Sequence, residues 1–572
     1  MELIVLALVG LTVLLVSAIF SRRTGIAAPL LLLVLGIIAS FIPWIPDIEL
    51  SNELVLLGIL PPILFASGRN VPVIEIRRNL KPIAWLSIVM VIVPAVIVGV
   101  IVHALFQEIS LPLAIALGAA VSPIDAVAAT SIGRRLGLPD RIMTLLEGES
   151  LFNDAAALVT MRMAVSALAV GFSFVEASLG FLWAVVGGLA IGYVVGRIIN
   201  WARGRLDDPI LVTVATLASP WASYIPAEQV HASGVIAVVV SAVLMTHLAP
   251  RSLNAEERAM VKSTWATVSY VLEHAVFLLM GMQITLLVSD ARSSGGMGRV
   301  WLMAIVVLVV LIVMRAVGVA AVVWMSNHRE TRARTLGRYL KDGLSEEGER
   351  RARARFGENW ESESSRWLNR TRADIDYALT EKISPKGGIV LAWAGMRGVV
   401  TLAAIQTLPY VAGGQLVDHR GTVILVAFLV AVTSLLLFGG TLPFVIRSTG
   451  LAAPGVDERR HEEKMLVRSM LETVNRELGP LAEQTIDGEP VPPHVITKLE
   501  RRMAVLNNRT NTEALRLERD TRDIYWALFT RYLDALRLAL EEERSVGAYS
   551  HHALRAAEEM LDRFEVNSRS RG

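Results

Sequence analysis

The sequence predicts an all-α polytopic membrane protein with about thirteen transmembrane helices and a helical cytoplasmic C-terminal tail. Hydrophobic residues make up 53% of the 572 residues, and the mean hydropathy is +0.52. A soluble chain of this length cannot bury so much apolar side chain, because single cores stop growing beyond roughly 250–300 residues. The apolar residues also come in blocks of about 18–25, which is the length that crosses a bilayer core of roughly 30 Å.

Each apolar block is expected to be helical, because in lipid every backbone N–H and C=O needs a partner within its own segment. The predicted spans are residues 2–20, 25–42, 52–68, 82–106, 111–132, 142–170, 176–202, 209–224, 229–249, 262–289, 298–325, 386–410 and 419–446.

The distribution of basic residues between the spans supports this count. Loops after odd-numbered spans hold Arg22 and Arg23, Arg77 and Arg78, Arg134, Arg135 and Arg141, Arg203 and Arg205, and Arg251 and Arg258. Loops after the even-numbered spans lack Lys and Arg, apart from Arg292 and Arg420 near two of them. Cytoplasmic loops carry the excess of Lys and Arg. We therefore expect a multi-pass protein of the plasma membrane with its N-terminus outside and its C-terminus in the cytoplasm.

Two segments are too polar to lie in lipid. We expect a transmembrane domain over 1–447, which includes a cytoplasmic loop at 326–385 dense in Arg and Glu, and a tail over 448–572. Apolar residues recur at helical spacing in three parts of the tail, namely 457–484, 494–507 and 512–545, and 485–493 is typical of a linker. The tail is either a small helical cap or a regulatory or dimer-stabilising element.

The fifth span contains a proline next to two oxygen-bearing side chains. Pro123 removes a backbone donor and clashes with the preceding turn, which frees carbonyls beside Ser122 and Asp125. Interrupted helices at mid-membrane form ion sites in many carriers. The alternative is a simple proline kink with Asp125 facing a water-filled vestibule.

The sixth span carries several polar residues on neighbouring faces. Glu147, Ser150 and Asp154 recur at i, i+3 and i+7, while Glu149 and Asn153 are four residues apart. Asp154 lies near mid-span, where ionisable groups are costly and usually functional. Burial disfavours the charged form of a carboxylate, so Asp154 is expected to hold either a proton or a cation, but not both.

Two arginines lie within other spans. Arg315 needs an anionic partner in lipid, and Glu149 is the expected one, in a fork-shaped ion pair that supports the site.

Arg397 lies between Gly395 and Gly398 in the twelfth span, where it predicts a second helix break. Breaks in the fifth and twelfth spans occupy matching positions if spans one to six and eight to thirteen are inverted repeats. Arg397 is then expected to neutralise carbonyl ends of the broken helix when no cation is bound.

Other chemistry has little support in the sequence. Cysteines are absent from the chain, and we find no nucleophile–base set, phosphate-cradling glycine loop or His/Asp metal cluster. We therefore expect no enzymatic activity, no cofactor and no nucleic-acid partner. His274, beside Glu273, is either a helix–helix contact or a pH sensor.

Several motifs together resemble the cation:proton antiporter-1 family, the NhaP-type bacterial antiporters and animal Na⁺/H⁺ exchangers. The matching stretches are Leu60–Phe65, Ser122–Val127, Glu147–Asp154, Arg315–Gly318, Gly395–Val400 and Thr441–Pro443. The resemblance covers about 1–450, and the run from Glu147 to Asp154 is its most specific part.

The resemblance implies a homodimer of thirteen-helix protomers with a moving six-helix core. It implies that Asp154 carries the cation or proton, that Asn153 is its partner, and that Ser150 ligates Na⁺ together with Asp154. Many members have an acid directly before the proline of the fifth span, whereas here Ser122 precedes it and Asp125 follows. Asp125 is thus either a ligand or a charge on the access path.

The expected activity is exchange of Na⁺ for H⁺ by alternating access, with Li⁺ and K⁺ as further candidate cations. A single exchangeable carboxylate, with Asn153 beside it, predicts electroneutral 1:1 exchange. The rival hypotheses are a K⁺/H⁺ antiporter and, from another class, a cation channel or membrane sensor.

Overall fold

The computed structural model describes most of the chain, with gaps. The described residues are 2–24, 28–42, 54–71, 73–170, 174–292, 297–339, 370–372, 374–375, 377, 379, 383–398, 405–412, 415–451, 456–479, 483–486, 489–497, 499 and 519–569.

The chain divides into two compact units. Unit 1 comprises Met1–Ser326 and Ile383–Ala453, and unit 2 comprises Asn327–Lys382 and Pro454–Gly572. The polar loop between the eleventh and twelfth spans therefore groups with the tail, which the sequence alone does not predict.

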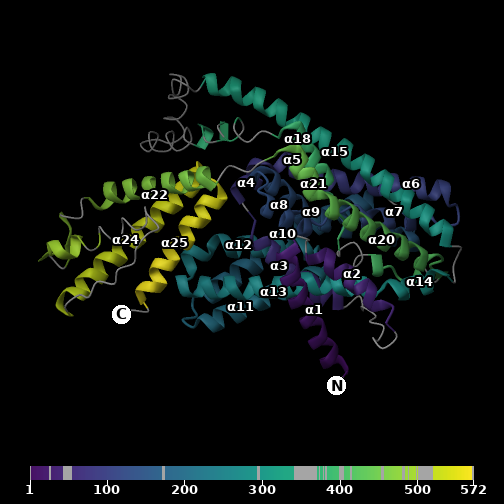
Figure 1. Ribbon diagram of the computed structural model, residues 1–572, viewed down its shortest axis with the longest axis horizontal. Helices are drawn as coiled ribbons and strands as arrows, with labels where there is room; N and C mark the ends of the chain where they lie inside the picture. Colours follow the sequence, from purple (N-terminus) through teal and green to yellow (C-terminus); the bar gives the residue numbers. More distant parts are fainter. Residues whose placement is uncertain are drawn as a thin grey trace. The chain divides into compact units, whose positions relative to one another are not determined.

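Unit 1 is almost wholly helical, as predicted (Figure 1). Its elements are α1 Glu2–Thr24, α2 Ala28–Ser40, η1 Leu54–Ile59, α3 Leu60–Arg69, α4 Val73–Arg78, α5 Leu80–Ala84, η2 Trp85–Val89, α6 Met90–Leu105, α7 Leu111–Val121, α8 Ala126–Leu136, α9 Asp140–Val170, α10 Phe174–Arg203, α11 Pro209–Gln229, α12 Gly234–Ser252, α13 Ala255–Met282, α14 Ile284–Arg292, α15 Met297–Tyr339, α18 Pro385–Trp393, the strands β1 Val411–Ala412 and β2 Gln415–Leu416, α20 Arg420–Ser434, η4 Leu435–Gly439 and α21 Gly440–Thr449. The η elements are π-helical turns, and the last part of α15 belongs to unit 2.

Most predicted spans coincide with an apolar helix. Among the described residues, seven helices are long and apolar enough to cross a membrane, and five shorter apolar helices accompany them. These helices fall within every predicted span except 386–410, where α18 ends at Trp393. The membrane crossing is thus supported, while the count of thirteen and the inverted repeats stay predictions.

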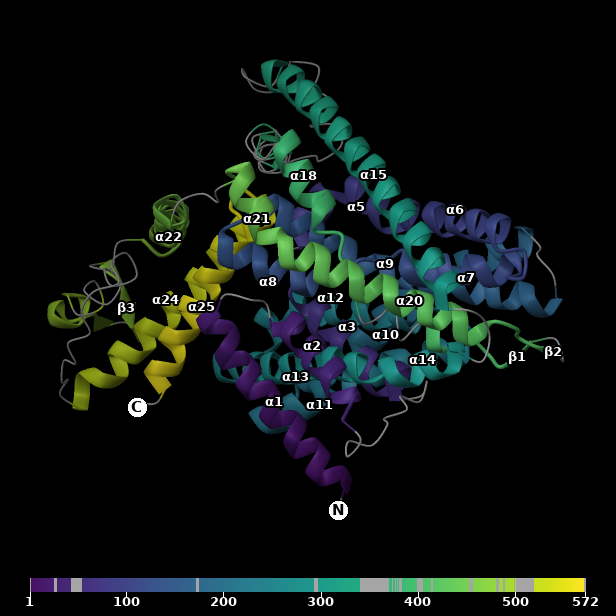
Figure 2. The same cartoon turned by 45° about the vertical axis from the view of Figure 1, so that its right-hand side comes forward.

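The helices of unit 1 form two groups that meet at α9. One group contains α2, α3 and α10–α13, and the other contains α6–α8 with α18, α20 and α21; α9 contacts members of both. Figures 1 and 2 show the first group below α9, and α18 and α21 of the second group above it. Within the first group α2 and α13 pack through Gly36 and Gly281, where a Cβ would overlap the backbone oxygens of Leu278 and Leu33.

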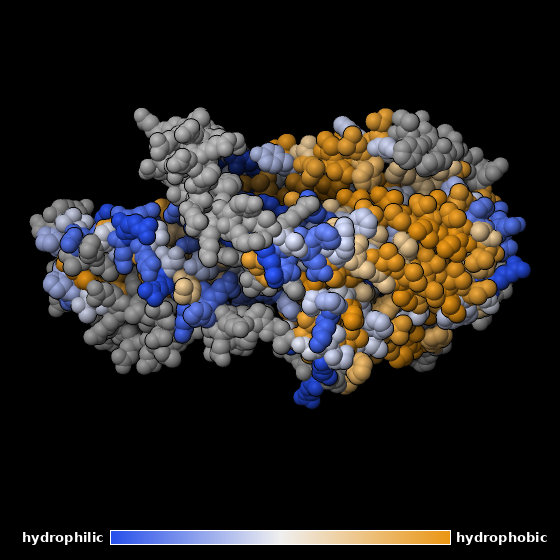
Figure 3. Space-filling view, turned by 90° about the horizontal axis from the view of Figure 1, so that it is seen from above, coloured by the Kyte–Doolittle hydropathy of each residue, from blue (hydrophilic) through white to orange (hydrophobic). Residues whose placement is uncertain are grey.

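Large apolar side chains remain exposed on the outer helices. On α10 and α15 the side chains more than half exposed include Leu182, Ile198, Trp201, Ile305, Val317 and Trp324. Figure 3 shows a broad hydrophobic area on one face of unit 1. Contiguous apolar surfaces of this kind are rare on soluble monomers, and lipid accounts for them.

Some helix boundaries differ from the predicted ones. Helix α15 continues to Tyr339 instead of ending near residue 325, because its polar extension retains helical pairs such as Glu330–Arg334 at 2.6 Å. The predicted tenth span is divided at Gln283 between α13 and α14.

Unit 2 contains a three-helix cluster. Helices α22 Val456–Leu478, α24 Arg519–Val546 and α25 His551–Arg569 contact one another. The predicted linker includes a small hairpin, with strand β3 Thr485–Ile486 paired to β4 Glu489–Pro490. Helix α25 was not predicted, and most of the predicted helix at 494–507 lies outside the described residues. Arg370, from the preceding loop, donates to the Ser545 carbonyl of the tail at 2.7 Å.

Candidate cation-binding site

The fifth predicted span is broken at its proline. Helix α7 ends at Val121, residues 122–125 are not helical, and α8 begins at Ala126. Pro123 has no N–H to donate to the helix ladder, and the break begins at the proline, because Ser122 still has helical dihedral angles. The Ser122 hydroxyl donates back to the Gly118 carbonyl at 2.6 Å. The segment is therefore a true interruption, and the simple kink is excluded.

A second interruption contacts the first. Helix α18 ends at Trp393, and residues 395–398 are not helical; residues 399–404 of the predicted span lie outside the described part. The Asp125 N–H donates to the Met396 carbonyl at 2.7 Å, which joins the two interruptions directly. A Cβ at Gly398 would overlap the Asp125 side chain, so this approach requires glycine.

Arg397 holds the two interruptions together. Its side chain is buried and donates to the Gly395 carbonyl at 2.7 Å and to the Val121 carbonyl, at the end of α7, at 3.2 Å. Carbonyls at a helix C-terminus have no helical partner and carry partial negative charge. The guanidinium satisfies such a carbonyl, and the predicted role of Arg397 when no cation is bound stays a prediction.

Arg315 forms a buried ion pair with Glu149. It donates to both oxygens of the Glu149 carboxylate and, at 3.0 Å, to the Leu391 carbonyl of α18. The two side chains are 6% and 3% exposed. This pair connects α9, α15 and α18, and it is the pairing that the sequence favours.

Asn153 and Asp154 adjoin the first interruption from α9. The Asn153 Nδ2 donates to the Ile124 carbonyl at 3.0 Å, while its buried Oδ1 accepts no hydrogen bond within the described part of the chain. Asp154 is 7% exposed. Among the described residues we find no side chain or backbone group that donates to its carboxylate.

A cavity of about 350 Å³ opens beside these residues. Its lining includes Asp154, Ser150 and Asp125, three of the predicted ligands, whereas Ser122 and Asn153 are not part of it. Carboxylate and hydroxyl oxygens are the ligands that hard cations prefer. The cavity thus brings together most of the oxygen ligands that the sequence identifies.

The cavity also contains groups that the sequence reasoning did not assign to the site. Glu147 of α9, and Glu273 and Ser269 of α13, all line it. Ser269 donates to Glu273 at 2.7 Å. The sequence does show Glu273 as a carboxylate within an apolar block, which marks it as a candidate functional residue. Its position in the cavity opposite α9 depends on the fold.

The balance of charge in the cavity favours cations. Four carboxylates line it, those of Asp125, Glu147, Asp154 and Glu273, and among the described lining residues Arg134 is the basic one. A cleft with one predominant sign of charge raises the local concentration of counter-ions. The nearby His274 contacts its own helix: its Nδ1 lies 2.8 Å from the Tyr270 carbonyl and its ring stacks on Tyr270. These contacts lie within α13, so the predicted helix–helix contact and the predicted pH sensor both stay predictions.

The whole of this arrangement lies within a region that matches a known family. The family model described as sodium/hydrogen exchanger, transmembrane, matches residues 10–448. An uncharacterized Na⁺/H⁺ exchanger of Mycobacterium tuberculosis is 30% identical over 448 residues, which cover 78% of this chain and 74% of that protein. The Na⁺/H⁺ antiporter ApNhaP of Aphanothece halophytica is 29% identical over 470 residues, 82% of this chain and 78% of that protein.

The fold is also similar to a solved structure. The sodium proton antiporter MjNhaP1 of Methanocaldococcus jannaschii superposes with a TM-score of 0.54 at 16% identity, over 78% of this chain and 99% of that one. At this identity the likeness supports the fold alone. Because the family model extends over most of the membrane unit and well over half of the chain, the protein belongs to the sodium/hydrogen exchanger family.

Proposed function

We propose that the protein exchanges Na⁺ for H⁺ across the membrane, with Asp154 as the carboxylate that binds either ion in turn. The observation that supports this proposal most directly is that Asp154 is buried, lines the cavity and receives no hydrogen bond from the described residues. An ionised carboxylate in such a place is costly unless it is neutralised. A proton and a cation can each neutralise it, and they exclude each other.

The neighbouring groups support a cation ligand set centred on Asp154. Ser150 and Asp125 line the same cavity, and the Asn153 Oδ1 is a buried acceptor beside it. In the proposed site Asp154 and Ser150 ligate Na⁺ and Asn153 contributes its Oδ1. Asp125 and Ser122 supply further oxygens from the interruption. The Ser122 hydroxyl donates its hydrogen to the Gly118 carbonyl, which leaves its oxygen lone pairs available to a cation.

The proposed exchange is electroneutral, with one proton for one cation. Asn153 cannot take a proton, so α9 supplies a single exchangeable acid next to the interruption. Arg397 stabilises the carbonyl of Val121 in the cation-free state. The transition between outward and inward access then moves a site of the same net charge in both loaded forms, so a complete cycle transfers no net charge.

K⁺/H⁺ exchange is the second candidate. A relative from Bacillus pumilus that is 26% identical over 488 residues is named a sodium, potassium, lithium and rubidium/H⁺ antiporter. Selectivity among alkali cations depends on cavity size and ligand number, so the assay below includes Na⁺, K⁺ and Li⁺.

The decisive experiment uses proteoliposomes with an imposed pH gradient. Addition of the transported cation should dissipate the gradient in wild type and in the control Asp207→Asn, whose carboxylate lies in the turn after α10. Asp154→Asn should abolish the response. Equal dissipation by wild type and Asp154→Asn would refute the assignment, and dissipation that requires a membrane potential would favour a channel.

We further propose a homodimer in the plasma membrane, with the N-terminus outside and the C-terminus in the cytoplasm. The alternation of Arg between loops supports this orientation. The chain has no cysteine, so labelling of one introduced cysteine shows on which side of the membrane that residue lies.

Ser110→Cys should react with a membrane-impermeant thiol reagent added outside the cell. Asp207→Cys should react only after the membrane is permeabilised. Mass measurement in native lipid tests the dimer.

A further inference from the structure

The cavity contains an ion pair between two of its own lining residues. Arg134 of α8 and Glu147 of α9 are 2.6 Å apart, and both line the cavity together with Asp154. Building on the proposed exchange, we propose that Glu147 is an outer cation-binding carboxylate and that Arg134 occupies it as a displaceable internal cation, which an entering Na⁺ must replace.

Glu147 lies on the same helical face as the proposed inner site. Glu147, Ser150 and Asp154 all line the cavity from α9. At a rise of 1.5 Å per residue, the seven positions from Glu147 to Asp154 span about 10 Å along the helix. This separation is too long for one ion to contact both carboxylates and short enough for a cation to pass from one to the other.

Polar side chains continue between the two levels. Thr130 and Ser131 line the cavity from α8, between the interruption at Asp125 and the ion pair at Arg134. Hydroxyl oxygens can replace water around a monovalent cation during this passage. The proposed path therefore runs from Glu147, past the hydroxyls, to Asp125 and Asp154.

The exposure of the pair indicates that it can open. The Arg134 and Glu147 side chains are 65% and 23% exposed. A second Arg–Glu pair on α9, Arg315 with Glu149, is 6% and 3% exposed and has an additional carbonyl acceptor. Exposed ion pairs contribute little net stability and are easily exchanged, whereas breaking a buried one leaves an uncompensated charge. These two pairs on one helix thus differ in lability, and the more labile of them lines the cation cavity. A further exposed pair on α9, Arg162 with Glu228, does not line it.

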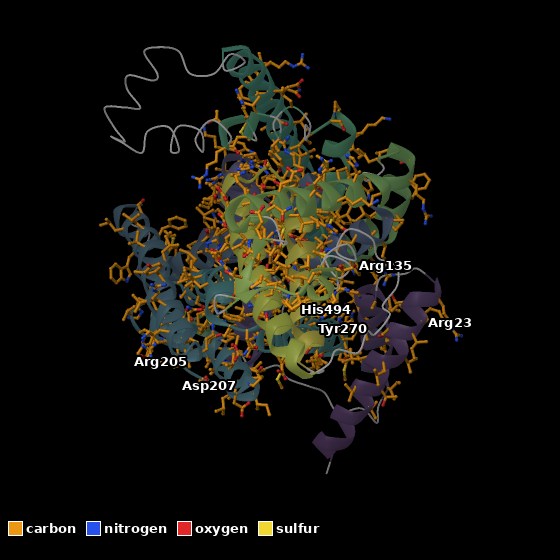
Figure 4. The ribbon with its side chains drawn as sticks, turned by 90° about the vertical axis from the view of Figure 1, so that its left-hand side faces the viewer. Arg23, Arg135, Arg205, Asp207, Tyr270 and His494 are labelled. Atoms are coloured by element: carbon orange, nitrogen blue, oxygen red, sulfur yellow. The ribbon has the colours of Figure 1, made fainter. Side chains whose placement is uncertain are left out.

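The neighbouring arginine provides a matched control. Arg135 follows Arg134 on α8 but donates to Ser21 of α1 at 3.3 Å and is not among the lining residues (Figure 4). Replacing either arginine removes one positive charge from the same end of α8. A long-range effect of charge should therefore be similar in both variants, while competition for Glu147 should be specific to Arg134.

The test measures exchange rate against Na⁺ concentration in proteoliposomes at fixed pH. Arg134→Gln should lower the half-saturating Na⁺ concentration about two- to fivefold, the range that an exposed ion pair supplies, while Arg135→Gln should leave it near wild type. Glu147→Gln should raise the half-saturating concentration, and Arg134→Gln should have no further effect in that background. The exchanged pair Arg134→Glu with Glu147→Arg should restore a value closer to wild type than either single change.

Two results would overturn the proposal. One is an equal shift, or none, in the two arginine variants; the other is a shift from Arg134→Gln that persists when Glu147 is already Gln. If wild type and Arg135→Gln exchange no cation at all, the proposed function itself fails. The rise in unfolding temperature of the purified protein with Na⁺ concentration then tests whether Arg134 competes with Na⁺. Arg134→Gln should reach half of the maximal rise at a lower Na⁺ concentration than wild type.

Discussion

Replacing Glu149 by Gln tests the buried ion pair that supports the site. The change preserves the shape of the side chain but removes the carboxylate to which Arg315 donates twice. Arg315 would then be a charged side chain, 6% exposed, with the Leu391 carbonyl as its remaining hydrogen-bond acceptor among the described residues. Gly395 is also close, since a Cβ there would lie 3.1 Å from the Arg315 Nε, so the guanidinium has little room to turn toward a new partner on that side.

The expected loss follows from the burial of both partners. Removing one member of a buried ion pair costs about 3–5 kcal/mol, because the other charge stays desolvated. Replacing both members, as in Glu149→Gln with Arg315→Met, should cost much less than either single change. The exposed pair Arg468–Glu472, with side chains 73% and 59% exposed, is the control, and Glu472→Gln should cost under about 1 kcal/mol.

Thermal unfolding of the purified protein in detergent provides the measurement. Glu149→Gln should lower the unfolding temperature by roughly 3–6 °C, Glu472→Gln should leave it almost unchanged, and the double variant should recover most of the loss. A wild-type unfolding temperature for Glu149→Gln, or a double variant as unstable as the single one, would refute the view that a desolvated charge is the cause.

Three other predictions concern the contact between the two helix interruptions, the carboxylate that α13 contributes to the cavity, and the tail. Gly398→Ala should reduce exchange more than about tenfold because its Cβ overlaps Asp125, whereas Gly440→Ala, whose Cβ meets no atom within 4 Å, should not; normal exchange by Gly398→Ala would contradict the close contact. Glu273→Gln should raise the half-saturating Na⁺ concentration by about two- to tenfold, since it removes one of the cavity's negative charges; an unchanged value would exclude Glu273 from the path. In unit 2, burial first, then the nearby Arg555, Arg544 and His552, lower the pKa of His551 to about 4. In the unfolded chain this histidine has a pKa near 6.5, so below that pH the unfolded state binds a proton that the folded state does not. The free energy of unfolding of the tail cluster should therefore be highest above about pH 6.5 and fall by up to about 3 kcal/mol toward pH 4. Hydrogen exchange of α24 and α25 in the full-length protein should show this loss, and His551→Gln should flatten it.

The apolar helices could be predicted from the sequence because hydropathy is a local property. A block of about 20 apolar residues identifies a span whatever its neighbours are, and twelve of the thirteen predicted spans contain an apolar helix. The exception, 386–410, has a similar composition. There α18 ends at Trp393, and the residues that follow contact the interruption in the fifth span, where the Met396 carbonyl accepts from the Asp125 N–H. That contact joins residues far apart in the sequence, so hydropathy does not report it.

The ligands could be identified individually, but not as a set. A carboxylate in an apolar block is conspicuous in any sequence. The sequence alone therefore identifies Asp154, Asp125 and Glu149 as candidate functional residues. Which of them share a cavity depends on how α8, α9 and α13 meet. The sequence identifies Glu273 as the neighbour of His274 and Glu147 as a member of one face of α9. Nothing local indicates that both line the cavity with Asp154.

Glu149 and Asp154 show how the fold gives different roles to the same chemical group. Both are buried carboxylates on α9, five positions apart. The two buried arginines nearby have other partners: Arg315 donates to Glu149 and Leu391, and Arg397 donates to the carbonyls of Gly395 and Val121. Glu149 therefore has a permanent cationic partner, which makes it part of the scaffold. Asp154 receives no such partner among the described residues, so its charge must be balanced by an ion from the cavity. If Arg315 or Arg397 were free to turn toward Asp154, it would compete with Na⁺ and with H⁺ alike. The hydrogen bonds that hold these arginines elsewhere are thus as necessary to the proposed exchange as the carboxylate itself.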